Sequence, residues 1–268
     1  MITERVPMEK IVSFKNQSGE KLAGTLHTPD AHSDRGVVLG HCFTCSRHTT
    51  ILRRICIDLA QAGFMAIRFD FSGNGQSEGD FSKSTHSKQI SEMKTAYDYI
   101  AARGASWIGM AGHSMGASTS LLAAARIDDV KAVCCMAGRL SGIEPSLILQ
   151  QNMLDEMELK GHVLFKSRGR DLKLSKQFFS DAARFDFPDI ISNLKTPMLI
   201  VHGDRDKIVS VEEAYKAHDR NPDGSELRII PKADHMFGGP DHLQHTVSEL
   251  VVGWFEKQWK HYQFSDKW

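Results

Sequence analysis

The chain has 268 residues, 41% of them apolar, and its 33 basic residues balance its 33 acidic ones. This length and composition predict one large core, so we expect a single domain over residues 1–268 with one insertion. Zero net charge gives no electrostatic reason to expect binding to nucleic acid or to an acidic membrane. No stretch is as long and apolar as a membrane span, and the N-terminal segment MITERVPMEK has no apolar run typical of a signal peptide.

The first half of the chain alternates between predicted strands and predicted helices. Segments 8–15 and 20–28 flank a turn and predict an opening antiparallel hairpin. Further on, continuous apolar runs predict buried strands, and longer segments with helical periodicity predict helices. In chain order these are strand 36–40, helix 50–62, strand 64–69 and helix 86–103.

The second half continues this alternation but is interrupted once. Its predicted elements are strand 130–135, strand 197–202, helix 211–218, strand 226–230 and a last helix from about residue 241. Strands alternating with crossover helices predict a mostly parallel sheet covered on both faces. The segment of about 140–191 is too long for a simple crossover, and we interpret it as an inserted cap. Within it the pattern predicts helix 143–159, hairpin 162–175 and helix 176–184.

Residues 107–123, WIGMAGHSMGASTSLLA, combine a short apolar run, the pattern G-x-S-x-G and a helix of small residues. This order predicts a strand, a sharp turn and a helix, which is the nucleophile elbow of serine hydrolases. Gly112 and Gly116 give the backbone room for the turn. Ser114 is therefore the predicted nucleophile.

A catalytic serine needs a histidine base and a carboxylate that orients the histidine. The predicted strand 197–202 is followed by Asp204 and Asp206, and the last predicted strand is followed by His235. Asp206 lies far enough into its loop to reach the histidine, whereas Asp204 is expected to cap the turn locally. We predict Asp206 as the acid and His235 as the base, and we interpret Asp234 as a turn-forming neighbour.

An oxyanion hole requires two convergent backbone N–H groups. One is expected from Met115, the residue after the nucleophile, and the other from the loop 41–46 after an early strand. We interpret His41 as a strand-end residue that holds this loop through hydrogen bonds.

The segments HCFTCS, RFDFSGNGQSEG, GHSMG, HGDRDKIV and ADHMF occur together in an order that resembles the α/β-hydrolase superfamily over nearly the whole chain. Within it the chain is similar to small bacterial serine esterases of the cinnamoyl/feruloyl-esterase type. The resemblance implies an α/β-hydrolase fold: a mostly parallel twisted sheet flanked by helices, with a small inserted cap. It also implies that Phe43 and Met115 supply the oxyanion N–H groups. Cys42 stands where these esterases usually have Gly.

Three other patterns were weighed. Cys42-x-x-Cys45 is compatible with a redox pair or half a zinc site, but no second pair of ligands is evident, so the role of both cysteines stays open. The glycines at 73, 75 and 79 do not have the spacing of a dinucleotide-binding loop. A basic cluster in the insertion is a solvated turn or a binding site for a carboxylate or phosphate. It comprises Lys166, Arg168, Arg170 and Lys173.

We therefore expect a serine hydrolase that cleaves small-molecule carboxylic esters through an acyl-enzyme, with no cofactor and no metal. Thioester cleavage and acyl transfer would use the same residues, and a non-catalytic sensing protein on the same fold is the alternative from another class. Five cysteines without a disulfide-scaffold spacing favour a cytoplasmic protein. The sequence leaves the oligomeric state open, a homodimer included.

Overall fold

The computed structural model describes residues 8–238 and 243–265. Its main sheet consists of β1 (Met8–Lys15), β2 (Lys21–Thr28), β3 (Arg35–Gly40), β4 (Met65–Phe69), β5 (Trp107–His113), β6 (Val130–Met136), β9 (Met198–Gly203) and β10 (Ser225–Ile230). The strand order is β1-β2-β4-β3-β5-β6-β9-β10. β1 and β2 form the predicted antiparallel hairpin, β2 also lies antiparallel to β4, and the other neighbours are parallel.

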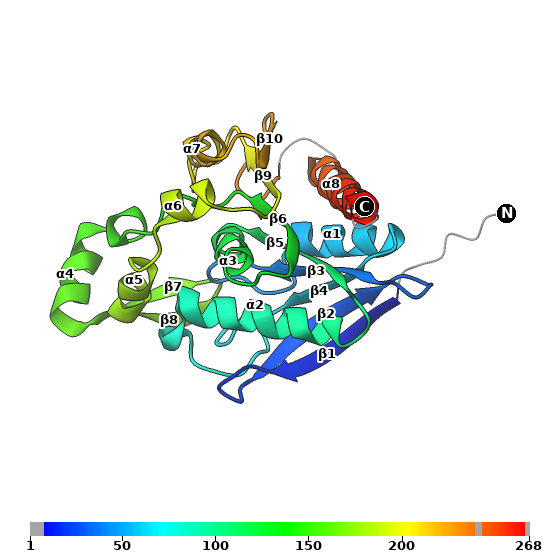
Figure 1. Cartoon of the computed structure of the whole chain (residues 1–268). Helices are drawn as coiled ribbons and strands as arrows, with labels where there is room; N and C mark the ends of the chain where they lie inside the picture. Colours follow the sequence, from blue (N-terminus) through cyan, green and yellow to red (C-terminus); the bar gives the residue numbers. More distant parts are fainter. Residues whose placement is uncertain (1–7, 239–242, 266–268) are drawn as a thin grey trace.

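Helices cover both faces of this sheet (Figure 1). They are α1 (Thr50–Gln61), α2 (His86–Ala101), α3 (Met115–Ala124), α6 (Phe187–Ser192), α7 (Glu212–Arg220) and α8 (Leu243–Ser265). One hydrophobic cluster joins the sheet to α1 and α8, and a second joins the opposite face to α2, α3, α6 and α7. This is the helix-flanked, mostly parallel sheet that the sequence predicts.

The strand ends explain where a site can form. β3, β5, β9 and β10 run parallel, so the loops that follow them meet at one edge of the sheet. β5 lies in the middle of the sheet and all seven of its residues are buried. The loop after β5 therefore has neighbouring loops on both sides.

The insertion between β6 and β9 contains the 3-10 turn η2 (Pro145–Leu147), α4 (Gln151–Lys160), β7 (His162–Ser167), β8 (Arg170–Ser175), α5 (Lys176–Ala182) and α6. β7 and β8 pair as the predicted antiparallel hairpin. A third hydrophobic cluster, which includes Val163, Leu174 and Phe178, ties the insertion to Met115 at the start of α3.

Two expectations about the insertion were wrong. The predicted helix 143–159 is instead η2 followed by α4. Glu144 is extended at φ −101° and ψ 147°, because a residue before proline disfavours helical backbone, and Gln150 is extended again at φ −74° and ψ 161°. α6 was not predicted, although Asp186 caps it by accepting a hydrogen bond from the N–H of Asp189. The predicted start of the last helix near residue 241 lies outside the described residues.

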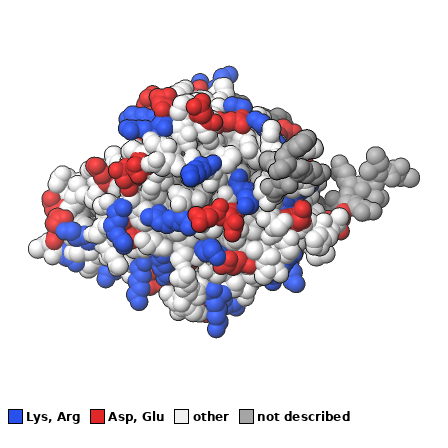
Figure 2. Space-filling view, in the orientation of Figure 1, with Lys and Arg blue, Asp and Glu red and all other residues white. Residues whose placement is uncertain are grey.

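In the described part of the chain, no helix is both long and apolar enough to cross a membrane. Residues 1–7, which hold most of the N-terminal segment considered above, lie outside the described residues. On the face that Figure 2 shows, basic and acidic side chains are interspersed, so neither sign forms a continuous field there.

Candidate active site

Ser114 occupies the sharp turn between β5 and α3. Its backbone has φ 57° and ψ −118°, a strained conformation that non-glycine residues rarely adopt. A Cβ atom at position 112 would collide with the carbonyl of Gly116, and one at position 116 with the carbonyl of Gly40. Both glycines are thus required by close backbone packing, as the sequence predicts, and the turn presents Ser114 at the edge where the strands end.

The structure brings Ser114, His235 and Asp206 together from three loops. His235 Nε2 lies 3.0 Å from Ser114 Oγ, and His235 Nδ1 lies 2.7 Å from Asp206 Oδ2. A carboxylate only accepts hydrogen bonds, so Nδ1 carries the proton and Nε2 is left as the acceptor facing the serine. This chain of contacts equips Ser114 to lose its proton to His235.

Asp206 is held in place by three further groups. Its Oδ1 accepts hydrogen bonds from the backbone N–H groups of Ile208 at 2.8 Å and Val209 at 2.9 Å. Its Oδ2 also lies 3.2 Å from Nε2 of His202, a buried residue at the end of β9. Burial raises the pKa of Asp206, but the hydrogen bonds from His202, His235 and Val209 outweigh burial and hold the pKa below its usual range. The carboxylate is therefore ionised at neutral pH.

The two other carboxylates near this site have different partners. Asp204 Oδ1 accepts the backbone N–H of Lys232 at 2.6 Å, so Asp204 bridges the loops after β9 and β10 instead of capping its own turn. Asp234 Oδ1 accepts the N–H groups of Met236 and Gly238, which makes it the turn-forming residue that the sequence predicts. Of the three carboxylates, Asp206 is the one that is hydrogen-bonded to the ring of His235.

The loop after β3 carries Phe43, and His41 orients its peptide. The N–H of Phe71 donates to His41 Nε2 at 3.0 Å, so the proton of the ring is on Nδ1, which donates to the carbonyl of Cys42 at 2.7 Å. That carbonyl and the Phe43 N–H belong to the same planar peptide unit and point in opposite directions. Holding the carbonyl therefore aims the N–H, as expected of a residue that fixes the loop.

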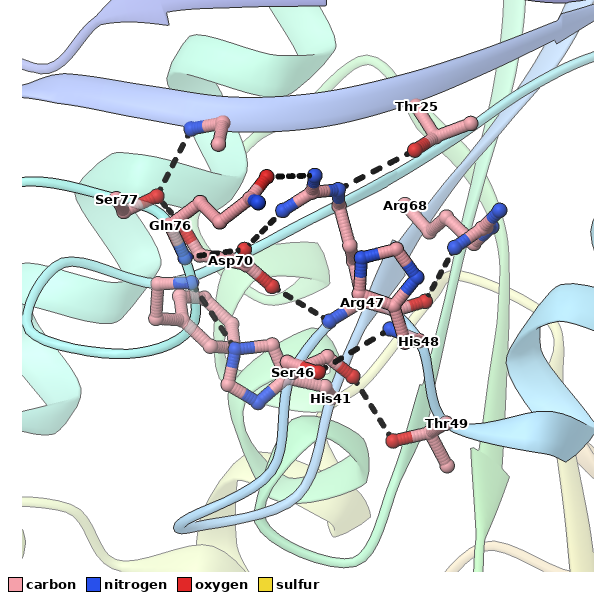
Figure 3. Close-up of polar contacts among 12 residues, drawn as sticks. Thr25, His41, Ser46, Arg47, His48, Thr49, Arg68, Asp70, Gln76 and Ser77 are labelled. Carbon is pink, nitrogen blue, oxygen red and sulfur yellow. Dashed lines mark hydrogen bonds and ion pairs between the residues drawn. The ribbon is translucent and has the colours of Figure 1, made fainter. Parts of the chain in front are cut away.

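A buried ion pair anchors the other end of this loop (Figure 3). Asp70, just after β4, accepts the backbone N–H of Arg47 at 2.6 Å and pairs with its guanidinium. Arg47 also donates to Gln76 Oε1 at 2.6 Å, and Arg68 donates to the Arg47 carbonyl at 2.6 Å. Both members of the Arg47–Asp70 pair are almost fully buried, so removing either would leave an uncompensated charge in the core. The loop is thereby fastened to β4.

The cysteines fall into two groups. Cys42 and Cys45 form a disulfide within the loop that contains Phe43. The disulfide shows that the two cysteines are bonded to each other, and it does not by itself indicate a reaction. Cys56, Cys134 and Cys135 are free and buried, and burial raises the pKa of Cys56 and Cys135 to about 12. Among the described residues no cluster of His, Cys, Asp and Glu could hold a metal ion.

Two cavities meet at Ser114. The apolar cavity, of about 260 Å³, is lined by Phe43, Met115, Ile143, Leu147, Phe178 and Ile208, with Ser114 in its wall. The basic cavity, of about 770 Å³, is lined by Ser114, His235 and four cationic residues, namely Arg168, Arg205, Lys207 and Lys232. Phe43, Ser114 and Ile208 belong to both walls. A substrate bound at Ser114 can thus extend into two chemically different spaces.

Two histidines that the sequence does not single out lie beside the site. His113, within G-x-S-x-G, lies with Nε2 2.6 Å from the backbone carbonyl of His235, and His202 contacts Asp206 as described above. Both are fully buried. His113 is the last residue of β5, and His202 is the last residue but one of β9. These positions are the signal in the sequence that could have indicated a role, because both strands end at the site.

Four histidines in the described chain are buried and have a pKa of about 4. They are His27, His41, His86 and His113. In each case burial is the largest cause, because it penalises the charged imidazolium. Both ring nitrogens of His86 are buried without a hydrogen-bond partner among the described residues. At neutral pH these four rings are neutral.

A family model described as serine aminopeptidase, S33 (Hydrolase_4) matches residues 32–187. Among curated protein sequences no match is found.

Solved structures similar to this one include several esterases. Est1E from Butyrivibrio proteoclasticus, solved with ferulic acid bound, has a TM-score of 0.80 and 25% identity, covering 92% of this chain and 98% of that one. The esterase domain of a Rhodothermus marinus protein has a TM-score of 0.70 and 24% identity, covering 92% and 97%. The Pyrococcus furiosus esterase Pf2001 has a TM-score of 0.67 and 21% identity, covering 94% and 93%. The last two similarities concern the fold alone.

Proposed function

Because the chain belongs to the serine aminopeptidase S33 family of α/β hydrolases, we propose that it is a serine esterase that cleaves small-molecule carboxylic esters through an acyl-enzyme. The observation that carries the proposal is the hydrogen-bonded chain from Ser114 through His235 to Asp206. The likeness to Est1E, an esterase by name, supports ester hydrolysis over other reactions of the same three groups.

In the proposed reaction Ser114 Oγ attacks the ester carbonyl while His235 Nε2 takes its proton. The backbone N–H groups of Phe43 and Met115 stabilise the negative charge that develops on the carbonyl oxygen. The bond between the carbonyl carbon and the alcohol oxygen then breaks, and His235 returns its proton to that oxygen. Water then attacks the carbonyl carbon of the acyl-serine and gives a proton to His235. The bond between that carbon and Ser114 Oγ breaks, His235 returns the proton to Oγ, and the acid is released. No metal or cofactor takes part.

The acyl half of the ester fits the apolar cavity. Phe43 and Met115, the proposed oxyanion donors, line that cavity together with Ser114, so a carbonyl held by them directs its acyl chain there. Phe43 and Phe178 both line it, with ring centroids 5.2 Å apart and ring planes tilted by 44°. Ferulic acid, the compound bound to Est1E, is an aryl acid, and aromatic walls suit such a group. We therefore propose an apolar aryl or short alkyl acyl group.

The name of the family raises aminopeptidase activity as a rival. An aminopeptidase must hold the α-ammonium of its substrate on the acyl side of the scissile bond, for which a carboxylate is the natural partner. No carboxylate is found among the described residues that line the apolar cavity, and its one charged member is Arg139. The cavity chemistry thus favours an uncharged acyl group over an amino acid residue.

The test is labelling and turnover with matched variants. The wild-type chain should react with a fluorophosphonate probe and hydrolyse 4-nitrophenyl butanoate. Ser114→Ala should abolish labelling, and Ser114→Ala and His235→Ala should each lower kcat by about 10⁴-fold or more. Labelling and turnover that persist in Ser114→Ala would refute the proposal, and an unreactive but folded wild-type chain would favour a sensing protein.

A further inference from the structure

We propose that the basic cavity binds the leaving group of the ester, and that this alcohol carries a carboxylate or phosphate. The inference rests on the proposed function, since it names the substrate class of that same site.

The position of His235 decides which half of the ester enters the basic cavity. In ester cleavage the histidine protonates the departing alcohol oxygen, so the alcohol lies on the histidine side of the serine. His235 lines the basic cavity and is not among the residues that line the apolar cavity. Because His235 must reach the alcohol oxygen, the alcohol half is assigned to the basic cavity and the acyl half to the apolar cavity.

The cations of this cavity come from three separate segments. Arg168 belongs to the β7–β8 turn, Arg205 and Lys207 to the loop after β9, and Lys232 to the turn after β10. All four are exposed, and within residues 8–238 and 243–265 none of their side chains makes an ion pair or a hydrogen bond. Four unpaired cations around one hollow create a positive potential that a negatively charged ligand would neutralise.

Arg168 is held over the cavity by its neighbours in the turn. Arg170 Nη2 donates to the carbonyl of Thr44 at 3.0 Å, and the hydroxyls of Ser167 and Thr44 share a hydrogen bond of 2.8 Å. These contacts fasten the tip of the insertion to the loop that contains Phe43. Arg168, with φ 51°, lies between the two anchors. Its cationic group thus lines the site even though its own side chain makes no hydrogen bond or ion pair with the described residues.

The nearby carboxylates do not cancel this charge. Asp234 is the acidic residue among the described lining, and its Oδ1 is occupied by two backbone N–H groups. Asp204, on the adjacent loop, uses Oδ1 for the backbone N–H of Lys232. Neither carboxylate forms an ion pair with any of the four cations. The described lining of the cavity therefore has a net positive charge and fits an anionic leaving group.

The experiment uses butanoate esters that differ only in the charge of the leaving group. The alcohols are 4-hydroxybenzamide, which is neutral, 4-hydroxybenzoate, and 4-hydroxyphenyl phosphate. Each kcat/KM is divided by the rate constant for alkaline hydrolysis of the same ester, which removes differences in leaving-group reactivity. At low ionic strength the corrected kcat/KM for an anionic ester should exceed that of the neutral ester by about tenfold, and 0.5 M salt should remove most of this preference.

Variants locate the preference within the cavity. Arg168→Gln, Arg205→Gln and Lys232→Gln should each lower the anionic-to-neutral ratio about two- to fivefold, mainly by raising KM for the anionic ester. Lys173→Gln is the matched control, because Lys173 is an exposed cation on β8 of the same hairpin that does not line the cavity. It should leave the ratio unchanged.

Each outcome has one meaning. A preference for the benzoate or for the phosphate ester that falls in the cavity variants supports the proposal, and the better of the two identifies the anion. A ratio near one in the wild-type chain, or an equal loss in Lys173→Gln, would overturn it. Ser114-dependent hydrolysis of the neutral ester separates this failure from failure of the proposed esterase function.

Discussion

Replacing Asp206 by asparagine should change which nitrogen of His235 carries the proton. The backbone N–H groups of Ile208 and Val209 both donate to Oδ1, so the amide oxygen of an asparagine has to take that position. Its NH₂ group then faces His235 Nδ1 and His202 Nε2. Nδ1 would become an acceptor, the proton would move to Nε2, and His235 could no longer accept the proton of Ser114.

The size of the loss follows from these contacts. Turning the asparagine over would set its NH₂ against two N–H donors. The side chain at position 206 is fully buried, so these donors face no water there, and a donor left without an acceptor costs about 1–3 kcal/mol. Two such donors cost at least about 2 kcal/mol, so only about one molecule in thirty would have the productive arrangement. The negative charge that stabilises the imidazolium is lost as well. We expect kcat to fall by between about 30-fold and the roughly 10⁴-fold found for the same change in a Ser-His-Asp protease.

The assay is the pre-steady-state acylation rate of Asp206→Asn with a 4-nitrophenyl ester, alongside its thermal unfolding temperature. Asp204→Asn is the matched control, since Asp204 contacts the backbone of Lys232 and not the imidazole. It should retain acylation within about threefold. If Asp204→Asn were the more damaging change in two equally folded variants, the assignment of Asp206 would be wrong.

Three further predictions follow. Leu147→Trp should reduce the apolar cavity, which Leu147 lines, and should lower kcat/KM for bulky acyl esters far more than for acetates; an equal loss for all acyl lengths would indicate a folding defect. Between about pH 5 and 8, kcat/KM should rise, because an imidazole acts as a base only after it has lost its proton. Asp206, whose pKa is held low, stays ionised throughout this range and does not contribute to the rise. A flat profile would contradict His235 as the base. In the unfolded chain His86 would bind a proton below about pH 6.5, whereas in the folded chain it is buried, has a pKa of about 4 and stays neutral. The free energy of unfolding is therefore unaffected by His86 above about pH 6.5 and decreases as the pH falls from 6.5 towards 4. At pH 5 this costs about 2 kcal/mol for one such histidine, and urea titrations should show a smaller pH dependence in His86→Phe than in the wild-type chain.

The relative positions of Ser114, Asp206 and His235 could be predicted because each follows a strand of a parallel sheet, and such strands end at one edge. His113 and His202 could not be assigned in the same way. A histidine at the end of an apolar strand gives no sign in the sequence of whether its ring faces the core or a catalytic group. Only the contacts with the His235 carbonyl and with Asp206 distinguish them from ordinary buried histidines.

The insertion was the least predictable region for related reasons. Its apolar spacing indicated one long helix, but the backbone is extended at Glu144, where Pro145 restricts it, and again at Gln150, where the apolar spacing gives no sign of a break. The predicted basic cluster also divided: Arg168 lines the basic cavity, whereas Lys166 and Lys173 are exposed elsewhere on the hairpin. The other three cations of this cavity, Arg205, Lys207 and Lys232, come from loops that are distant from Arg168 in the sequence. A search for neighbouring basic residues in the sequence therefore cannot find this group.

The wall that the two cavities share has a consequence for how selectivity can diverge or be engineered. Phe43 and Ile208 line both cavities, so a change in the size of either side chain alters the fit of the acyl group and of the alcohol together. Ile143 and Phe178 line only the apolar cavity, and Lys232 only the basic one. Libraries that vary positions lining a single cavity can therefore change selectivity for one half of the ester without changing selectivity for the other half. Libraries at Phe43 or Ile208 will yield variants in which both preferences move at once.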